Sequence, residues 1–309
     1  MSIRWMHKCS VFGLSLTATL AAALLGCGGG MPESSDAVAI PEPNVNLTPS
    51  AAASKTAAST PAAGAASSTS TTSAAPVKAE GWGTLKGQIV FGGDPPKASV
   101  LAEQGKAAKN PEVCAKDAPI LSERLVVDGA TKGVKNVLVY LPRPTAVNED
   151  ARKAASGAIV MFDQAKCVFD PHVLGLMVGV PVELKSSDPV NHNVNAKLKN
   201  STFNQTIAGG QSFKFTPSAA ERTPGNIVCD IHPWMSAWWM VVDHPYIAVT
   251  DTKGNFEIKN VPAGTQKVVV WQEAVGFVTA PSGEDVTIKP NDTTAQGFTI
   301  DPAKVKPAS

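Results

Sequence analysis

The stretch Cys229-Asp230-Ile231-His232-Pro233-Trp234-Met235 decides how the rest of the sequence is interpreted. It brings a thiol, an imidazole and a thioether onto one short segment. A second imidazole, that of His192, lies upstream between Ser187 and Val194. Two His and one Cys, with a weakly bound Met, are the ligands of a mononuclear copper site for electron transfer. We therefore predict that His192, Cys229, His232 and Met235 hold one copper ion.

Each ligand also has an ordinary structural interpretation. A lone Cys most often acts as a small buried hydrophobic residue, and Met235 beside Trp234 is equally compatible with a core position. The spacing C-x2-H-x2-M changes the balance, because it places three soft or borderline ligands on one tight loop. The distant His192 comes from a separate apolar segment. Together these features favour a metal site over three unrelated core residues.

The segment from Met161 to Val242 resembles a cupredoxin, the plastocyanin-like domain. In that family the first His ligand lies on a strand, and Cys, the second His and Met share a later loop. His192-Asn193-Val194 is similar to the family's His-Asn-Val, where the Asn ties the His strand to the Cys loop. Cys229 and His232 match the C-x2-H spacing. The resemblance implies one-electron transfer by copper and a redox partner protein, such as a cytochrome.

Met235 departs from the family's pattern. Plastocyanins have four residues between His and Met, whereas this loop has two. The shorter spacing is similar to that of the binuclear copper site of oxidase subunits, but that site needs a second Cys in the loop. Met235 is therefore our expected weak axial ligand, with Met240 or no axial ligand as the alternatives.

Residues 1–26 are expected to be a signal peptide. A basic start precedes an apolar run from Val11 to Leu25, which is short for a membrane span. The run ends in Leu24-Leu25-Gly26-Cys27, which resembles a bacterial lipobox. That resemblance implies cleavage before Cys27, acylation of its thiol and, with Gly28 next, anchoring at the outer membrane facing the periplasm. The alternatives are an ordinary signal peptide or an anchor helix.

Residues 27–80 are expected to be a disordered tether. Between Pro49 and Glu80, 27 of the 32 residues are Ala, Ser, Thr or Pro, and the window contains no Trp, Phe, Tyr, Leu or Ile. Such a composition buries too little apolar surface to offset the entropy of ordering the chain. A flexible coil of this length spans roughly 40 Å.

Charge and motifs exclude several classes of function. The whole chain has a formal net charge of +1, and loss of Arg4 and Lys8 with the signal leaves 25 − 26 = −1. This balance gives no support for nucleic-acid binding. The sequence has no phosphate-binding glycine loop and no nucleophile elbow. We therefore expect a binding or electron-transfer protein and no enzyme.

The globular part reads as short strands throughout. Residues 85–91 alternate and end at a Gly-Gly-Asp-Pro-Pro turn, and residues 125–129 and 134–141 form a predicted hairpin. Residues 147–155 form the single predicted helix, with Asn148 as its cap. The pattern predicts an all-β fold, a cupredoxin Greek-key β-sandwich associated with a second β-sandwich.

The second sandwich is expected around the C-terminal segment. Residues 247–258 read as a hairpin turning at Lys253-Gly254, and a Pro-Ala-Gly turn precedes a strand over 267–271. This resembles the carboxypeptidase regulatory-like sandwich, which is Ig- or transthyretin-like. The segment is too short to form that sandwich alone. We expect residues 81–145 and 245–303 to share it, with the cupredoxin-like domain, residues 155–244, inserted between them.

Cysteine count supports an unpaired sulfur at the loop. With Cys9 removed and Cys27 acylated, Cys114, Cys167 and Cys229 remain. An exported protein with three thiols favours one bridge and one free sulfur. Cys114 and Cys167 lie outside the ligand loop and are the expected pair, worth about 2–4 kcal/mol by restricting the unfolded chain. The alternative is that both are buried thiols.

The remaining histidines, His172 and His244, are expected to be structural, with extra metal ligation as the alternative. Trp234, Trp238 and Trp239 are expected to pack around the ligand loop, with an exposed docking patch as the alternative. Two rival functions use the same residues. One is a copper chaperone or buffer; the other is a cell-envelope interaction module with a structural metal site.

Overall fold

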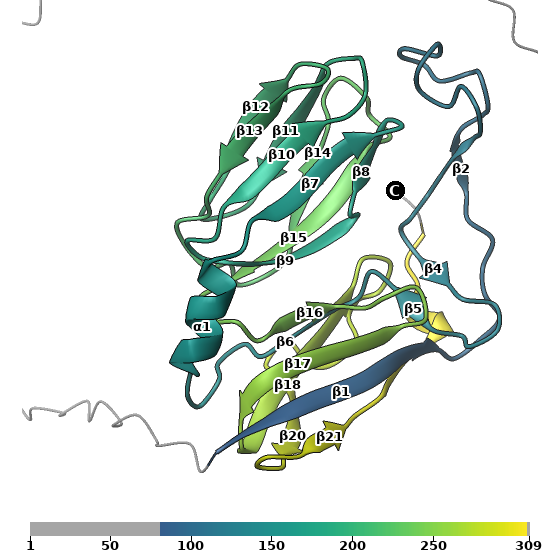
Figure 1. Ribbon diagram of the computed structural model, residues 1–309. Coiled ribbons are helices and arrows are strands. Elements are labelled where there is room, and N and C mark those ends of the chain that lie inside the picture. Colours follow the sequence, from purple (N-terminus) through teal and green to yellow (C-terminus); the bar gives the residue numbers. More distant parts are fainter. Residues whose placement is uncertain (1–80, 308–309) are drawn as a thin grey trace, which may run out of the picture. The chain divides into compact units, whose positions relative to one another are not determined.

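The computed structural model describes residues 81–307, and strands dominate throughout this part of the chain (Figure 1). These residues all lie within one compact unit of the chain. They form an all-β structure with one α-helix and one short 3-10 helix, Pro302–Lys304. The predicted signal peptide, Cys27 and the tether lie outside the described residues. Within the described part, no helix is long and apolar enough to cross a membrane.

Residues 160–242 form a β-sandwich that we call the site sandwich. Its first sheet has the order β13-β10-β7-β8 and its second the order β12-β11-β14-β15-β9. The strands of the first sheet are β7 (Val160–Ala165), β8 (Val168–Asp170), β10 (Val182–Ser186) and β13 (Ser212–Phe215). Those of the second are β9 (Val173–Met177), β11 (His192–Lys197), β12 (Phe203–Ile207), β14 (Gly225–Val228) and β15 (Ser236–Val242).

The core of the site sandwich is aromatic at its centre. Phe162 stacks on Phe169 at 5.0 Å between ring centroids, and Trp239 meets Phe162 edge-on at 4.9 Å. All three side chains are buried. Burial of such rings supplies much of the hydrophobic stabilisation of a small sandwich. Cys229 and Met235 of the ligand loop belong to the same apolar cluster.

A second sandwich, which we call the flanking sandwich, joins strands from both ends of the described chain. Strand β1 (Trp82–Phe91) pairs antiparallel with β17 (Asn255–Pro262) and parallel with β21 (Thr293–Ala295) and β22 (Phe298–Ile300). The opposing sheet contains β16 (Ile247–Val249), β6 (Leu138–Tyr140), β18 (Gly264–Gln272), β19 (Gly276–Phe277) and β20 (Glu284–Ile288). Leu85, Val139 and Val270 belong to one buried core between these sheets.

The predicted hairpin over residues 247–258 is wrong. The turn exists, with Gly254 at a positive φ of 77°. However, β16 pairs with β6 in one sheet and β17 pairs with β1 in the other. The turn therefore carries the chain across the sandwich. Alternation of apolar residues cannot separate the two cases, because the inward side chains reach the same core either way.

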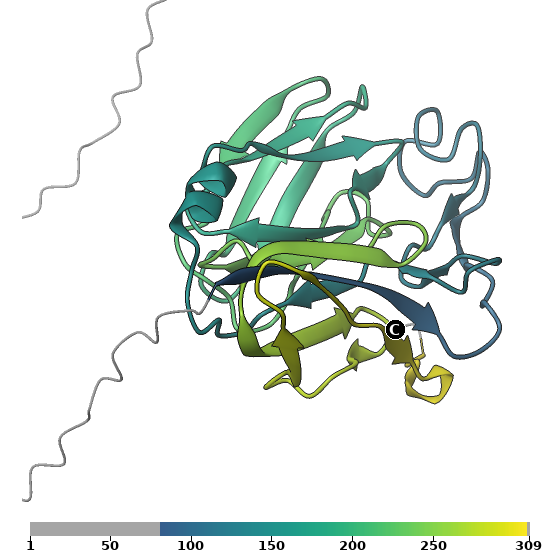
Figure 2. The same ribbon diagram turned by 60° about the horizontal axis from the view of Figure 1, so that its bottom comes forward.

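The segment between β2 (Val100–Ala102) and β3 (Ile120–Leu121) also departs from the expected division. The sequence predicts that it belongs, with the rest of residues 81–145, to the second sandwich, but Ala107, Cys114 and Ala115 are buried in the core of the site sandwich. We call residues 103–119 the cover segment (Figure 2). Its bridge from Cys114 to Cys167 explains the change, because it ties the segment to the loop between β7 and β8.

Two local predictions are confirmed. Helix α1 spans Glu149–Ser156, and the Asn148 side chain accepts a hydrogen bond from the Ala151 N–H at 2.9 Å, as an N-cap does. Strands β4 (Val126–Val127) and β5 (Val134–Lys135) pair antiparallel as the predicted hairpin.

A third apolar cluster joins the two sandwiches. Trp238 and Met240 of β15 pack there with Trp271 of β18, and the rings of Trp238 and Trp271 lie 5.0 Å apart. Trp239, which lies between Trp238 and Met240 in the sequence, points into the core of the site sandwich. Strand alternation therefore directs the neighbouring side chains of Trp238 and Trp239 into two different cores. Trp239 is buried, whereas Trp234 and Trp238 are half-buried, which agrees with packing around the site.

Strand β1 pairs with three C-terminal strands, so a substitution in it tests the flanking sandwich. Leu85 is fully buried there, so Leu85→Ala should lower the free energy of unfolding by about 2–5 kcal/mol. Lys86→Ala is the matched control, because its exposed ion pair with Glu257 should matter by less than about 1 kcal/mol. Denaturant unfolding of both variants measures the difference. Equal effects would show that β1 does not contribute to this core.

Candidate metal centre

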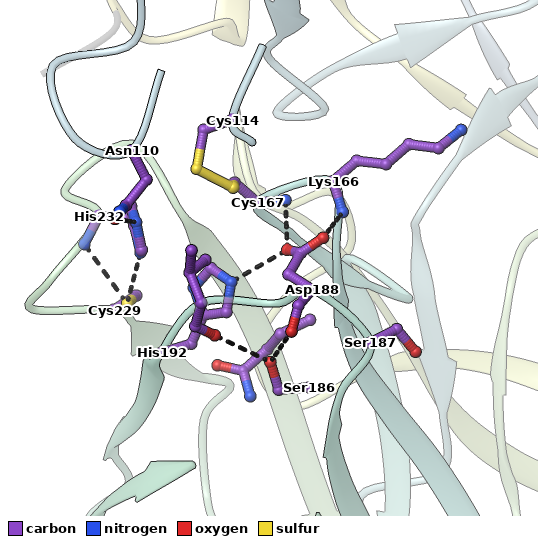
Figure 3. Close-up of polar contacts among 12 residues, drawn as sticks. Asn110, Cys114, Lys166, Cys167, Ser186, Ser187, Asp188, His192, Cys229 and His232 are labelled. Carbon is purple, nitrogen blue, oxygen red and sulfur yellow. Dashed lines mark hydrogen bonds and ion pairs between the residues drawn. A yellow bond between two sulfur atoms is a disulfide. The ribbon is translucent and has the colours of Figure 1, made fainter. Parts of the chain in front are cut away.

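The antiparallel pairing of neighbouring strands brings the predicted ligands together. Asn195 of β11 lies opposite Val228 of β14. Cys229 follows Val228 directly, and His192 begins β11, so both lie at the same end of the sheet. The ligand atoms of His192, Cys229 and His232 all lie within 4.8 Å of one another (Figure 3). Their exposed fractions are 0%, 2% and 0%, so the group is closed to solvent.

Cys229 lies in surroundings that favour a thiolate. Its sulfur accepts hydrogen bonds from the backbone N–H groups of Asn193 at 3.5 Å and His232 at 3.4 Å. Burial alone would raise the pKa of this thiol, but the interaction with nearby His192 and hydrogen bonds from backbone N–H groups bring it below the ordinary value of 9.0. A thiolate is the form that binds a metal.

His192 is held by its outer nitrogen and leaves the inner one free. Nε2–H donates to Asp188 Oδ2 at 3.0 Å, because a carboxylate can only accept. Nδ1 is buried and has no hydrogen-bond partner among the described residues. Burial opposes a charge on the ring, but the bond to Asp188 and the attraction of the nearby Cys229 thiolate outweigh it and raise the pKa of His192 above 6.5.

His232 has the same arrangement. Its Nε2–H donates to Asn110 Oδ1 at 3.1 Å, and its Nδ1 lies 3.8 Å from Cys229 Sγ. Burial, with a smaller effect of nearby His192, lowers the pKa of His232 to about 4. The ring is therefore neutral near pH 7, with a lone pair on Nδ1 that faces the thiol.

Two residues that orient the imidazoles were missed from the sequence. Asp188 is buried and also accepts from the backbone N–H of Lys166 at 2.6 Å and of Cys167 at 2.7 Å. These bonds outweigh its burial and lower its pKa, so it stays ionised. Its place four residues before His192 is a signal that sequence reasoning had available. Asn110 lies 122 residues from His232, and no sequence pattern connects the two.

Asn193 ties the two ligand segments, as the resemblance implies. Its Oδ1 accepts from the Asp230 backbone N–H at 2.7 Å, and its Nδ2 donates to Asp230 Oδ2 at 2.8 Å. Asn195 and Asn204 donate to the same carboxylate. Asp230 thus joins β11, β12 and the ligand loop at one point.

Met235 and Met240 occupy different environments. Met235 is buried in the same core as Cys229, and its backbone closes the loop by accepting from Cys229 N–H at 3.2 Å. Met240 lies on the opposite face of β15, in the cluster between the sandwiches. The alternative of Met240 as axial ligand is therefore not supported, because its side chain points away from the site.

The structure contains a bridge between Cys114 and Cys167, and Cys229 is unbridged. The sulfurs of the bridge lie within 4.8 Å of a His232 ring nitrogen (Figure 3). The bridge therefore lies next to the site.

The other histidines have partners elsewhere. His172 Nε2 lies 2.6 Å from Glu273 Oε2, so it pairs with a carboxylate of the flanking sandwich. His244 Nδ1 accepts from the Tyr246 backbone N–H at 3.2 Å. Both contacts agree with the structural interpretation, although that of His172 is with a side chain and not with backbone.

No family model matches the chain, and no curated protein does. The similar solved structures include cupredoxins. The copper-containing nitrite reductase of Thermus scotoductus SA-01 is 21% identical, with a TM-score of 0.26 over 28% of this chain and 22% of that one. A mutant of amicyanin in its Cu(I) form is 19% identical, with a TM-score of 0.25 over 28% of this chain and 89% of that one.

The purple cupredoxin from Nitrosopumilus maritimus is 20% identical, with a TM-score of 0.24 over 27% of this chain and 99% of that one. TM-scores of this size establish neither family nor function for this chain. The residues of the site must therefore carry any functional conclusion.

The donor set fits a copper ion. A buried ring nitrogen without a partner is costly, and the free Nδ1 of His192 would gain one from a metal ion. Two imidazoles oriented by oxygen acceptors and one thiolate suit a soft or borderline ion. His192, His232 and Cys229 would hold it.

In the metal-free protein the pKa values of the two imidazoles should be shifted in opposite directions from the ordinary value of 6.5. His232 should gain its proton only near pH 4, and His192 should keep its proton above pH 6.5. Between pH 6.5 and 4 the unfolded chain binds a proton at His232 that the folded chain does not, so this residue makes stability fall as the pH is lowered. NMR titration of both rings measures this. A pKa of His232 near 6.5 would contradict the burial argument.

Proposed function

We propose that this protein is an exported, lipid-anchored copper protein that transfers single electrons. The observation that carries the proposal is the closed group of His192, Cys229 and His232, in which both Nε2 atoms are bonded to oxygen acceptors. Each imidazole therefore offers Nδ1 to the inside of the site. A copper chaperone would present its ligands to a partner, and these ligands are buried.

Copper bound here would supply a one-electron couple, in which Cu(II) plus one electron gives Cu(I). Cys229 would contribute a thiolate that suits Cu(I), and the two imidazoles suit both oxidation states. The sandwich would keep water out and hold the rings in one geometry through Asp188 and Asn110. Because the three ligand side chains are buried, the proposed role is that of an electron carrier.

Met235 is the proposed weak axial ligand. It is buried in the core beside Cys229 and is the thioether on the loop that the two other ligands share. A long axial bond to Met tunes the potential of such sites without holding the ion in place.

The expected location follows from the N-terminal sequence. Leu24-Leu25-Gly26-Cys27 supports acylation at Cys27 and anchoring to the outer membrane within the periplasm. The proposed partner is a one-electron redox protein, such as a cytochrome, that gives or takes the electron. We further propose that residues 81–145 and 245–303 form a carboxypeptidase regulatory-like domain, apart from the cover segment described above.

The ligand hierarchy separates electron transfer from simple copper binding. Cys229→Ser should abolish the intense thiolate-to-copper absorption of the copper-loaded protein, since that band needs the sulfur. Met235→Leu should keep the band and raise the potential, because a weak electron-donating ligand has gone. Visible spectra and redox titration measure both.

Met240→Leu is the matched control, since Met240 faces away from the site. It should leave the potential unchanged. A wild-type protein that binds copper without the band, or exchanges it within mixing time, would instead support copper handling.

The lipid anchor has its own test. Cys27→Ser should leave the protein unacylated and release it from the membrane fraction, because the thiol is the acylation site. Fractionation and mass spectrometry of the mature N-terminus measure this. Membrane retention of the variant with normal signal cleavage would show that another segment anchors the chain.

A further inference from the structure

The outer edge of His232 is covered by a segment from another part of the chain. His232 is fully buried, and its Nε2–H is bonded to Asn110 of the cover segment. Asn110 is itself half-buried and stands between the ring and solvent. Its Nδ2 donates to Glu112 Oε1 at 3.1 Å, which turns Oδ1 towards His232.

Few contacts hold the cover segment in place. Within the described chain, its hydrogen bonds are internal except the one from His232 to Asn110. The remaining attachments are the bridge from Cys114 to Cys167 and the packing of small apolar side chains such as Ala107. The segment is thus held by the bridge, by the bond from His232 and by this packing.

The bridge also connects the two acceptors that orient the imidazoles. On one side, the Cys114 N–H donates to the Asn110 carbonyl at 2.7 Å, so Asn110 and Cys114 share one turn. On the other side, the Cys167 N–H donates to Asp188, which holds His192. Figure 3 shows the bridge between Asn110 on one side and Asp188 on the other.

We propose that residues 103–119 are a latched cover over the metal centre, with Asn110 as the positioning residue for His232 and the Cys114–Cys167 bridge as the latch. The cover shields the His232 edge from water and slows the release of metal. This inference rests on the proposed function for its metal, but its geometry concerns the protein alone.

The choice of variant follows from the backbone. Asn110 has a positive φ of 45°, which Asn, Asp and Gly tolerate and Ala resists. Asn110→Gly therefore removes the side chain without straining the turn. Asn110→Asp keeps an oxygen acceptor for the His232 Nε2–H. Lys106→Ala, an exposed change in the same segment, is the matched control.

The first experiment uses the metal-free full chain. The Nε2–H protons of His192 and His232 should both be visible by NMR, because both are bonded and buried. Asn110→Gly should speed the exchange of the His232 proton with water and leave that of His192 unchanged as an internal control. Lys106→Ala should behave as wild type, and Asn110→Asp should fall between wild type and Asn110→Gly, because it keeps the acceptor but places a second carboxylate beside Glu112. If Asn110→Gly leaves the His232 proton protected, or Lys106→Ala exposes it equally, Asn110 is not the positioning residue.

The second experiment uses the Cu(II)-loaded full chain with EDTA as the acceptor. Asn110→Gly should release copper faster by roughly 10–100-fold, the range for loss of a group that orients a ligand. The double variant Cys114→Ala/Cys167→Ala should release it at least as fast, and Lys106→Ala at the wild-type rate. Equal rates of copper release from the wild type and all variants would contradict the proposal that residues 103–119 cover the site.

The two experiments separate this inference from the proposed function. If the wild type lacks the thiolate band but Asn110→Gly still exposes the His232 proton, the proposed cover is supported and the proposed electron-transfer function is contradicted. If the band is present and Asn110→Gly changes neither proton exchange nor copper release, the proposed electron-transfer function is supported and the proposed cover is contradicted.

Discussion

The register between β11 and β14 is the constraint on which the site depends. Because Asn195 lies opposite Val228, the chain continues to Asn193 and Cys229 at the same end of the sheet. The backbone N–H of Asn193 then reaches the Cys229 sulfur, and His192 lies next to it. A shift of one residue would turn the His192 side chain to the other face of the sheet. The loop between β14 and β15 supplies the rest, since its closure at Met235 leaves His232 directed inwards.

The polarity of the site is balanced by contacts outside it. Three donor atoms buried in an apolar core would be costly without partners. Asp188 and Asn110 take the outer N–H of each imidazole, and backbone N–H groups take part of the charge on the sulfur. This leaves the inner nitrogens free to bind a metal ion. The same contacts lower the pKa of Cys229 and raise that of His192, so the electrostatics and the geometry have one cause.

The bridge gives these contacts a common support. Asn110 and Asp188 come from segments far apart in the sequence, yet each is bonded to the backbone of one bridged cysteine. The cover segment reaches the site from the part of the chain that precedes the site sandwich. A segment that the sequence analysis assigns to the flanking sandwich thus completes the environment of His232. Packing of Met240 and Trp238 between the two sandwiches holds the opposite face of the same sheet.

The sequence by itself determined the fold class, the short helix and the ligand candidates, because these depend on local patterns. Alternating apolar residues, the Asn148 cap and the spacing from Cys229 to His232 act over a few residues each. Only the tertiary structure decided which sheet each strand of the expected hairpin joins, and that Met240 faces away from Cys229. It alone placed Asn110 against His232, across 122 residues. The physical reason is that sheet membership and contacts between distant segments depend on packing and long-range pairing, which a local pattern does not encode.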